Sequence, residues 1–310
     1  MHQGLVFGEP VWLERHAQRL GLLPSAGGAV SAWRWQRASG ASADLWRPWD
    51  GHTARLQALA SYPLVPWSNR IGGGGFEHAG RFHPLAPNTP DDPYPIHGDG
   101  WQQPWTLTLD GPGAATMALR SERFGGSPYV YEARQTFALV EGGLTQTLTV
   151  TNACDTALPF GLGQHPWFER SPRCRLQARV EGVWLSRPDR MPTTYTGTFP
   201  EGWDLGAGAH PDRIVIDNGF GGWDGEARIE WPDRRLALHM RSEWVLPDGS
   251  RGQPGCLLYA PASPPVFCFE PISHPINAAH LPGRPGWVEL RPGQSMSLNV
   301  HWRFSDLAPG

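Results

Sequence analysis

Hydrophobic and polar residues alternate with a period of two along much of the chain. The alternation is clearest in 105–110, 115–120, 131–140, 144–152 and 235–242, with β-branched or aromatic residues among them. This pattern is typical of strands that bury one face and expose the other. We therefore predict a β-strand in each of these segments.

Glycine and proline residues separate the predicted strands, as expected for a chain of many short strands and turns. Residues 141–143 join two alternating runs, which predicts a hairpin. Near the C-terminus, Pro292 and Gly293 are predicted to form the turn of a second hairpin within 287–304. Helical patterns are short and confined to 54–60 and 276–280.

Nothing in the composition marks a domain boundary, and no repeat of fixed length recurs along the 310 residues. So many short strands in one chain are accommodated most economically by packed sheets. We expect an all-β fold, a large many-stranded antiparallel β-sandwich, in which residues 1–310 form a single domain.

The basic residues are all arginine, 26 in total, and the chain contains no lysine. It therefore cannot form a lysine Schiff base or complete a lysine-containing phosphate loop. The net charge is only −3 with histidine neutral, and charged residues form no long run. This balance argues against a nucleic-acid or membrane-surface partner.

We expect neither a targeting segment nor a redox-active cysteine motif. The first thirty residues lack the apolar centre of a signal peptide, and no apolar run approaches a membrane span. The cysteines form no C-x-x-C pair and have no zinc-ligand spacing to histidine; they are Cys154, Cys174, Cys256 and Cys268. We expect a cytoplasmic protein with reduced cysteines and no bound metal.

The stretch "FGLGQHPWF", residues 160–168, places a histidine and a proline in an otherwise buried run. Pro166 cannot donate to a sheet ladder, so the strand is predicted to end or bend there. His165 is then expected at the lip of a sheet, facing a space lined by Trp167 and Phe168. The alternative is a structural histidine in the core.

Three further segments carry polar residues in turns or at a strand end. Arg70 precedes four glycines, which let a ligand approach closely, and a fixed guanidinium suits oxygen-rich ligands. His97 precedes a Gly-Asp-Gly turn. Glu270 follows the apolar run "VFCF" and precedes Pro271, so we expect it at a strand end, where partial burial would raise its pKa. Each residue alone also fits an ordinary surface or ion-paired role.

Together the four segments would form a pocket with one carboxylate, two imidazoles, one guanidinium and several indoles. That set suits acid–base chemistry on a neutral polyol, because the carboxylate can accept a hydroxyl proton while an imidazolium donates one.

Five motifs, in order, resemble those of the aldose 1-epimerases, also called galactose mutarotases. They are "PWSNRI", "GRFHPLAPN", "HGDGW", "GLGQHPWF" and a strand ending in "FEP". The resemblance covers most of the chain. It implies a galactose mutarotase-like supersandwich with a sugar pocket on one face of a sheet. It also implies that Glu270 is the general base and His165 the general acid.

The same resemblance implies a set of substrate-binding residues, namely Arg70, His97, Asp217, Asn69 and Trp167. The match at Asp217 is the weakest, because Asn218 stands where a histidine usually follows. Gln164 and Pro166 also depart from the commoner form of the "QHPWF" motif. The "HGDGW" segment lacks the longer glycine-rich loop of galactose-specific members, which leaves the identity of the sugar open.

The implied reaction opens the hemiacetal ring and closes it on the other face, which requires no cofactor. We expect His165 to stay charged near neutral pH because the Glu270 carboxylate lies nearby. The expected partner is a small sugar, and the expected assembly is a monomer or a homodimer.

Four other functions remain open on the sequence alone. A carbohydrate-binding protein without catalysis would keep the aromatic faces and Arg70. A mutarotase for phosphorylated sugars would need arginines such as Arg81, Arg123 and Arg170 at the pocket rim. A metal-dependent cupin-type isomerase or a glycoside hydrolase would need metal ligands or a second catalytic carboxylate.

Overall fold

The computed structural model describes residues 7–308. Within that range the chain forms 24 β-strands and five 3-10 turns, and no α-helix. The two segments with helical patterns contain only single 3-10 turns, η1 (Leu56–Ala58) and η5 (Ala278–His280). The all-β prediction is therefore confirmed. No helix between residues 7 and 308 has the length and hydropathy to cross a membrane.

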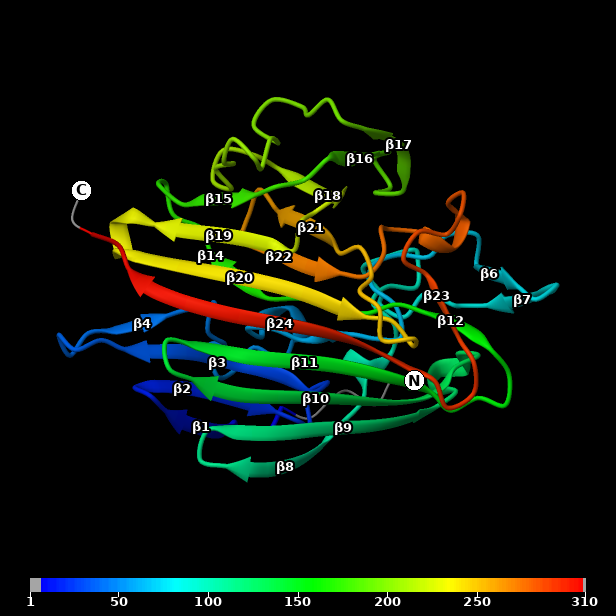
Figure 1. Ribbon diagram of the computed structural model, residues 1–310, viewed down its shortest axis with the longest axis horizontal. Helices are drawn as coiled ribbons and strands as arrows, with labels where there is room; N and C mark the ends of the chain where they lie inside the picture. The colour runs from blue at the N-terminus through cyan, green and yellow to red at the C-terminus, as the bar shows by residue number, and fades with distance from the viewer. Residues whose placement is uncertain (1–6, 309–310) are drawn as a thin grey trace.

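One of two eight-stranded sheets, here called the front sheet, has antiparallel strands that run side by side in Figure 1. In spatial order they are β15 (Arg175–Ala178), β19 (Glu226–Trp231), β20 (Leu236–Val245), β24 (Ser295–Asp306), β11 (Gly143–Asn152), β10 (Val130–Val140), β9 (Ala114–Glu122) and β8 (Thr106–Gly111). All five strands predicted from the alternation lie here. The predicted hairpin is also confirmed, because Val140 pairs with Gly143.

A second sheet of eight strands, here called the back sheet, contains Trp167, Asp217 and Glu270. Its strands are β17 (Pro192–Thr196), β16 (Gly182–Ser186), β18 (Ile216–Gly221), β21 (Gly255–Ala260), β22 (Val266–Ile272), β13 (Gly163–Gln164) and β5 (Pro63–Leu64), and β14 (Trp167–Glu169) also pairs with β22.

The remaining strands form a four-stranded N-terminal sheet and two small pairs. They are β1 (Val11–Arg15), β2 (Gln18–Leu23), β3 (Ala29–Gln36) and β4 (Ser42–Asp44); β12 (Leu158–Phe160) with β23 (Val288–Leu290); and β6 (Gly75–His78) with β7 (Arg81–Pro84). The other 3-10 turns are η2 (Gly100–Gln102), η3 (Phe124–Gly126) and η4 (Pro232–Arg234).

The predicted C-terminal hairpin is wrong, although a turn does form at Pro292 and Gly293. The strands on its two sides enter different sheets: β23 pairs with β12, whereas β24 lies between β11 and β20. Asn152 explains the divergence. Its backbone and side chain bond Gly293, Gln294 and Leu290, which ties the turn to the end of β11.

The main core fills the space between the sheets and is rich in indoles. Trp302 on β24 packs edge-on against Trp33 and Trp46 of the N-terminal segment, at centroid distances of 6.3 and 5.3 Å. Strand β22 is buried on both faces. Phe267 and Phe269 face this main core, whereas the alternate residues belong to a second cluster on the opposite face. That alternation places Glu270 on the second face.

Candidate active site

The pairing of β22 with the strand beside it brings Glu270 and His165 together. Gly163 of β13 lies opposite Ile272, and Trp167 of β14 lies opposite Cys268. The same register, continued through the gap between β13 and β14, sets His165 opposite Glu270. His165 Nε2 is 3.3 Å from Glu270 Oε1, with both side chains buried.

Two proline residues mark this part of the back sheet. The ladder is interrupted at Pro166, as predicted, between β13 and β14. Strand β22, however, does not end at Glu270 but continues through Pro271 to Ile272. A residue without an N–H is tolerated there because the neighbouring ladder is interrupted opposite it.

Aromatic rings fix the plane of the His165 imidazole. It stacks between Tyr62, at a centroid distance of 4.5 Å, and Trp167, at 5.1 Å. Its own backbone N–H donates to the carbonyl of Tyr62. Trp167 lines the space in front of His165, as expected, but Phe168 does not. Because side chains alternate along a strand, Phe168 points into the main core instead.

Burial sets the charges of the catalytic pair. It lowers the pKa of His165 to about 3 and raises the pKa of Glu270 well above its ordinary value. Without sugar, a proton shared by the pair therefore lies on the carboxyl group rather than on the imidazole. The expectation that His165 is charged near neutral pH is wrong for this state, because burial removes the solvation of the imidazolium and also favours the neutral form of the Glu270 carboxyl beside it.

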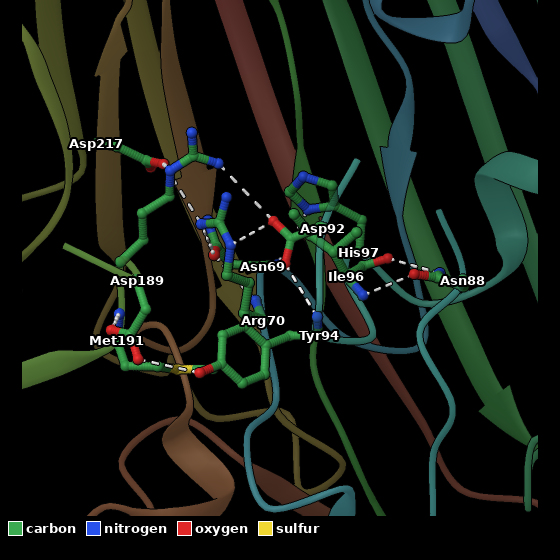
Figure 2. Close-up of polar contacts among 11 residues, drawn as sticks. Asn69, Arg70, Asn88, Asp92, Tyr94, Ile96, His97, Asp189, Met191 and Asp217 are labelled. Atoms are coloured by element: carbon green, nitrogen blue, oxygen red, sulfur yellow. Dashed lines mark hydrogen bonds and ion pairs between the residues drawn. The ribbon is translucent and has the colours of Figure 1, made fainter. Parts of the chain in front are cut away.

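His97 and Asn69 bind each other through their backbones and one ring nitrogen. Asn69 N–H donates to His97 Nδ1, and His97 N–H donates to the Asn69 carbonyl, both at 3.0 Å. Burial lowers the pKa of His97, so the ring is neutral and its proton lies on Nε2. Asn88 holds the main chain on both sides of His97, because it bonds Ile96 (Figure 2) and the carbonyl of Gly98. His97 thus offers a fixed N–H donor.

Arg70 is held by acceptors on three sides. Its Nε donates to Asp92 at 2.7 Å, and its Nη1 donates to Asn69 Oδ1 at 3.1 Å and to Asp217 at 3.4 Å (Figure 2). Arg190 approaches the same two carboxylates from the other side. The guanidinium of Arg70 is buried, so these bonds fix its orientation.

A cavity of about 470 Å³ joins all the predicted site residues. Its lining includes all seven of them, namely Glu270, His165, Arg70, His97, Asp217, Asn69 and Trp167. The aromatic rings of Tyr62, Trp101 and Tyr259 complete its walls. This volume lies within the range of small-molecule sites. The sequence prediction therefore grouped residues that the fold does bring together.

Some lining residues were missed by sequence reasoning. Asp92 stands in the acidic pair of "PDDPYPIHG", a signal that was available but has no defined role on its own. Arg190 lies in a turn, "RPDRMP", whose sequence indicates no functional role.

Asn218, the residue after Asp217, does not line the cavity. Its side-chain amide donates to the carbonyl of Trp184 and to Ser186 Oγ on the adjacent strand β16, where it has a structural role.

Three side chains at the site could hold a metal ion. The ligand atoms of His165, Cys268 and Glu270 all lie within 4.8 Å of one another. No spacing in the sequence indicates this group, because Cys268 and His165 are distant along the chain. Burial raises the pKa of Cys268, so the thiol is protonated and is a poor ligand unless a metal displaces the proton. That no metal is required stays a prediction.

Comparison with known proteins places this geometry in context. Residues 13–303 match the family profile described as aldose 1-epimerase. The chain is 35% identical to YphB, an uncharacterized protein of Escherichia coli K12, over 78% of this chain and 83% of YphB.

Solved structures of other proteins share the fold of this chain. A candidate aldose 1-epimerase from Escherichia coli K12 superposes with a TM-score of 0.85 at 29% identity, covering 96% of this chain and 99% of that one. A GalM/aldose epimerase homologue from C. elegans shares the fold, with a TM-score of 0.81 at 17% identity over 98% of this chain and 100% of that one. The extent of the profile match and the identity to YphB together show that this chain belongs to the aldose 1-epimerase family.

Proposed function

We propose that this protein interconverts the α and β anomers of a free, neutral aldose, with Glu270 and His165 as the proton-transferring pair. The main support is their placement, 3.3 Å apart on opposed strands, facing a cavity of suitable size. Glu270 Oε2 is buried without a hydrogen-bond partner, as expected for an atom that awaits a ligand hydroxyl.

Sugar binding would move the shared proton. The anomeric hydroxyl donates a hydrogen bond to Glu270, which favours the carboxylate, and the ring oxygen accepts one from His165, which favours the imidazolium. The pair therefore reaches its charged arrangement only against the sugar.

Ring opening then returns the pair to the neutral forms that burial favours. Glu270 takes the proton of the anomeric hydroxyl, and the C1–O5 electrons pass to O5 as that bond breaks. His165 protonates O5, which leaves an open-chain aldehyde. Rotation about C1–C2 presents the other face, and the reverse transfers close the ring and restore the pair. Each acid or base contribution is worth about 10²–10⁴-fold.

The remaining predicted residues would hold the sugar in this orientation. The Arg70 guanidinium and the His97 Nε2–H are fixed donors, and Asp217 is an acceptor with some exposure to the cavity. Asn69 orients both Arg70 and His97. Trp167 lines the cavity and would contact the sugar ring, while His165 stacks on its indole and the Arg47 guanidinium lies over it.

The arginines of the cavity already have partners, which favours a neutral sugar over a phosphorylated one. Its lining contains as many guanidinium groups as carboxyl groups: Arg47, Arg55, Arg70 and Arg190 with Asp91, Asp92, Asp217 and Glu270. Three of the arginines pair with carboxylates, and Arg47 bonds the carbonyls of Gln57 and Leu59. The arginines suggested earlier for a phosphate site, Arg81, Arg123 and Arg170, do not line it.

Mutarotation of a panel of sugars tests this proposal. Pure anomers of glucose, galactose and their 6-phosphates would be followed by polarimetry or NMR, with and without EDTA. We expect acceleration of at least one neutral aldose, unaffected by EDTA, and a loss of about 10²-fold or more in Glu270→Gln. Glu132→Gln, at an exposed position of the front sheet, is the matched control and should keep the wild-type rate.

Tight sugar binding without faster mutarotation would identify a carbohydrate-binding protein instead. Faster conversion of the 6-phosphates than of the neutral sugars would overturn the assignment of the substrate class.

A further inference from the structure

The turn between β16 and β17 carries an arginine to the cavity. Arg190 adopts a left-handed backbone conformation with φ of 69°. The turn is closed by bonds from Arg187 N–H to the Met191 carbonyl and from Arg190 N–H to the Arg187 carbonyl. A left-handed backbone is uncommon for arginine. The two backbone hydrogen bonds of the turn hold Arg190 in this conformation.

A hydrogen bond ties this turn to the segment that carries His97. Asp189 accepts from the Tyr94 hydroxyl at 3.0 Å and from the Met191 N–H at 3.1 Å (Figure 2). Tyr94 N–H in turn donates to Asp92 Oδ1. The turn and the Asp92 segment are therefore fixed relative to each other, although they lie about 95 positions apart.

The side chain of Arg190 lines the cavity and is 49% exposed, whereas Arg70 is 5% exposed. Its Nε lies 3.5 Å from Asp217, and its Nη1 lies 3.8 Å from Asp92. Arg70 contacts the same carboxylates at 3.4 and 2.7 Å. The contacts of Arg190 are longer and better solvated, so a ligand hydroxyl can replace them at lower cost.

We propose that Arg190 is a substrate-positioning residue that closes one side of the cavity mouth. Its guanidinium donates hydrogen bonds to sugar hydroxyls, and the same hydroxyls donate to Asp92 or Asp217. This inference rests on the proposed function. A guanidinium and a carboxylate side by side match a sugar hydroxyl, which is both a donor and an acceptor. Arg70 anchors the carboxylates, which leaves the outer guanidinium free to meet the substrate.

Arg190 also acts on Glu270 through Asp217. Burial is the largest cause of the raised pKa of Glu270; the Asp217 carboxylate raises it further, and Arg70 lowers it. The side chains of His165 and Cys268 also face this carboxyl group. Without Arg190, Asp217 would keep only one guanidinium partner. Its negative charge would then act more strongly on Glu270 and raise the pKa of that carboxyl further.

Steady-state kinetics of two Arg190 variants test the proposal. In Arg190→Ala we expect KM to rise about 10-fold, as for the loss of a charged hydrogen bond, with kcat within about threefold of wild type. The alkaline limb of kcat/KM should move to higher pH. Arg190→Lys keeps the charge, so it should restore the pH profile while KM stays raised.

A second pair of variants separates positioning from folding. Tyr94→Phe removes the bond to Asp189 and should raise KM by a smaller factor than Arg190→Ala. Arg179→Ala, at an arginine 87% exposed and outside the cavity, should match wild type. An unchanged KM and pH profile in both Arg190 variants would overturn the proposal.

A separate measurement distinguishes failure of this inference from failure of the proposed function. If the wild-type protein accelerated no mutarotation, sugar affinity measured by calorimetry would still report on Arg190. About 10-fold weaker binding in Arg190→Ala would support its role in positioning, and equal affinity would overturn it.

Discussion

At the residue scale, the behaviour of Glu270 and His165 depends on where one shared proton lies. Their identities and proximity were predicted from sequence motifs. Their charges were not, because a motif does not report burial, and burial favours the neutral form of each group. Arg190 was missed for a similar reason, since its role follows from contacts with Asp92 and Asp217 that are remote in sequence.

The pH dependence of kcat/KM follows from this single proton. Below neutral pH, activity should persist until His165 takes a second proton, and burial lowers its pKa well below the ordinary 6.5. At high pH, activity should fall as Glu270 loses the shared proton, at its raised pKa. We therefore expect no acid limb near pH 6.5 when kcat/KM is measured from pH 4 to 8.5. A midpoint there would show that His165 titrates as a solvated imidazole.

At the element scale, the interrupted strand beside β22 explains the site. Pro166 was correctly predicted to break the strand, and the constant register on both sides of the break places His165 opposite Glu270. The C-terminal turn shows the limit of local patterns. Pro292 and Gly293 do form a turn, but the pairing of the flanking strands is set by contacts with Asn152, which no local pattern reveals.

Asp99 anchors the turn after His97. Its contribution to the free energy of unfolding should depend on pH. Asp99 accepts bonds from Tyr131, Ser121 and Gln103, while its Oδ2 is buried without a partner. Burial raises its pKa from 3.8 to about 7. Because the folded state favours the protonated acid, its stabilisation is complete below pH 3.8 and is lost as the pH rises to about 7.

Asp99→Asn keeps the shape and removes this titration. Three pKa units correspond to about 4 kcal/mol, so wild type should lose up to that amount relative to the variant between pH 4 and 7. Urea unfolding at pH 4.5 and 7.5 measures the difference, with Asp110→Asn on exposed strand β8 as the control. Identical pH dependence in wild type and Asp99→Asn would contradict this account.

At the scale of the whole molecule, the front sheet is a scaffold and the back sheet with its loops forms the cavity. None of the lining residues belongs to a front-sheet strand. The front sheet was well predicted because one solvated face gives it a clear alternation. In the back sheet only the strands before Glu270 and around His165 were predicted, since strands such as β21 are largely buried and lack that pattern. The single-domain assignment and the assembly state stay predictions.

Trp302 tests this separation of scaffold and site. It is 1% exposed and contacts Trp33, Trp46 and Phe168 in the main core. Trp302→Ala should lower the free energy of unfolding by about 3–5 kcal/mol, measured with urea. Its KM for sugar at 25 °C should change little while the protein remains folded. A large change in KM with little loss of stability would contradict a purely structural role.

A double-mutant cycle on Glu270 and His165 tests the central claim most directly. The rate of mutarotation would be measured in wild type, Glu270→Gln, His165→Gln and the double variant. If the two residues act as one proton-transferring pair, each single change lowers kcat by about 10²–10⁴-fold. The kcat of the double variant is then only slightly below that of the less active single variant. Losses that multiply in the double variant, or a rate undiminished in either single variant, would contradict the account.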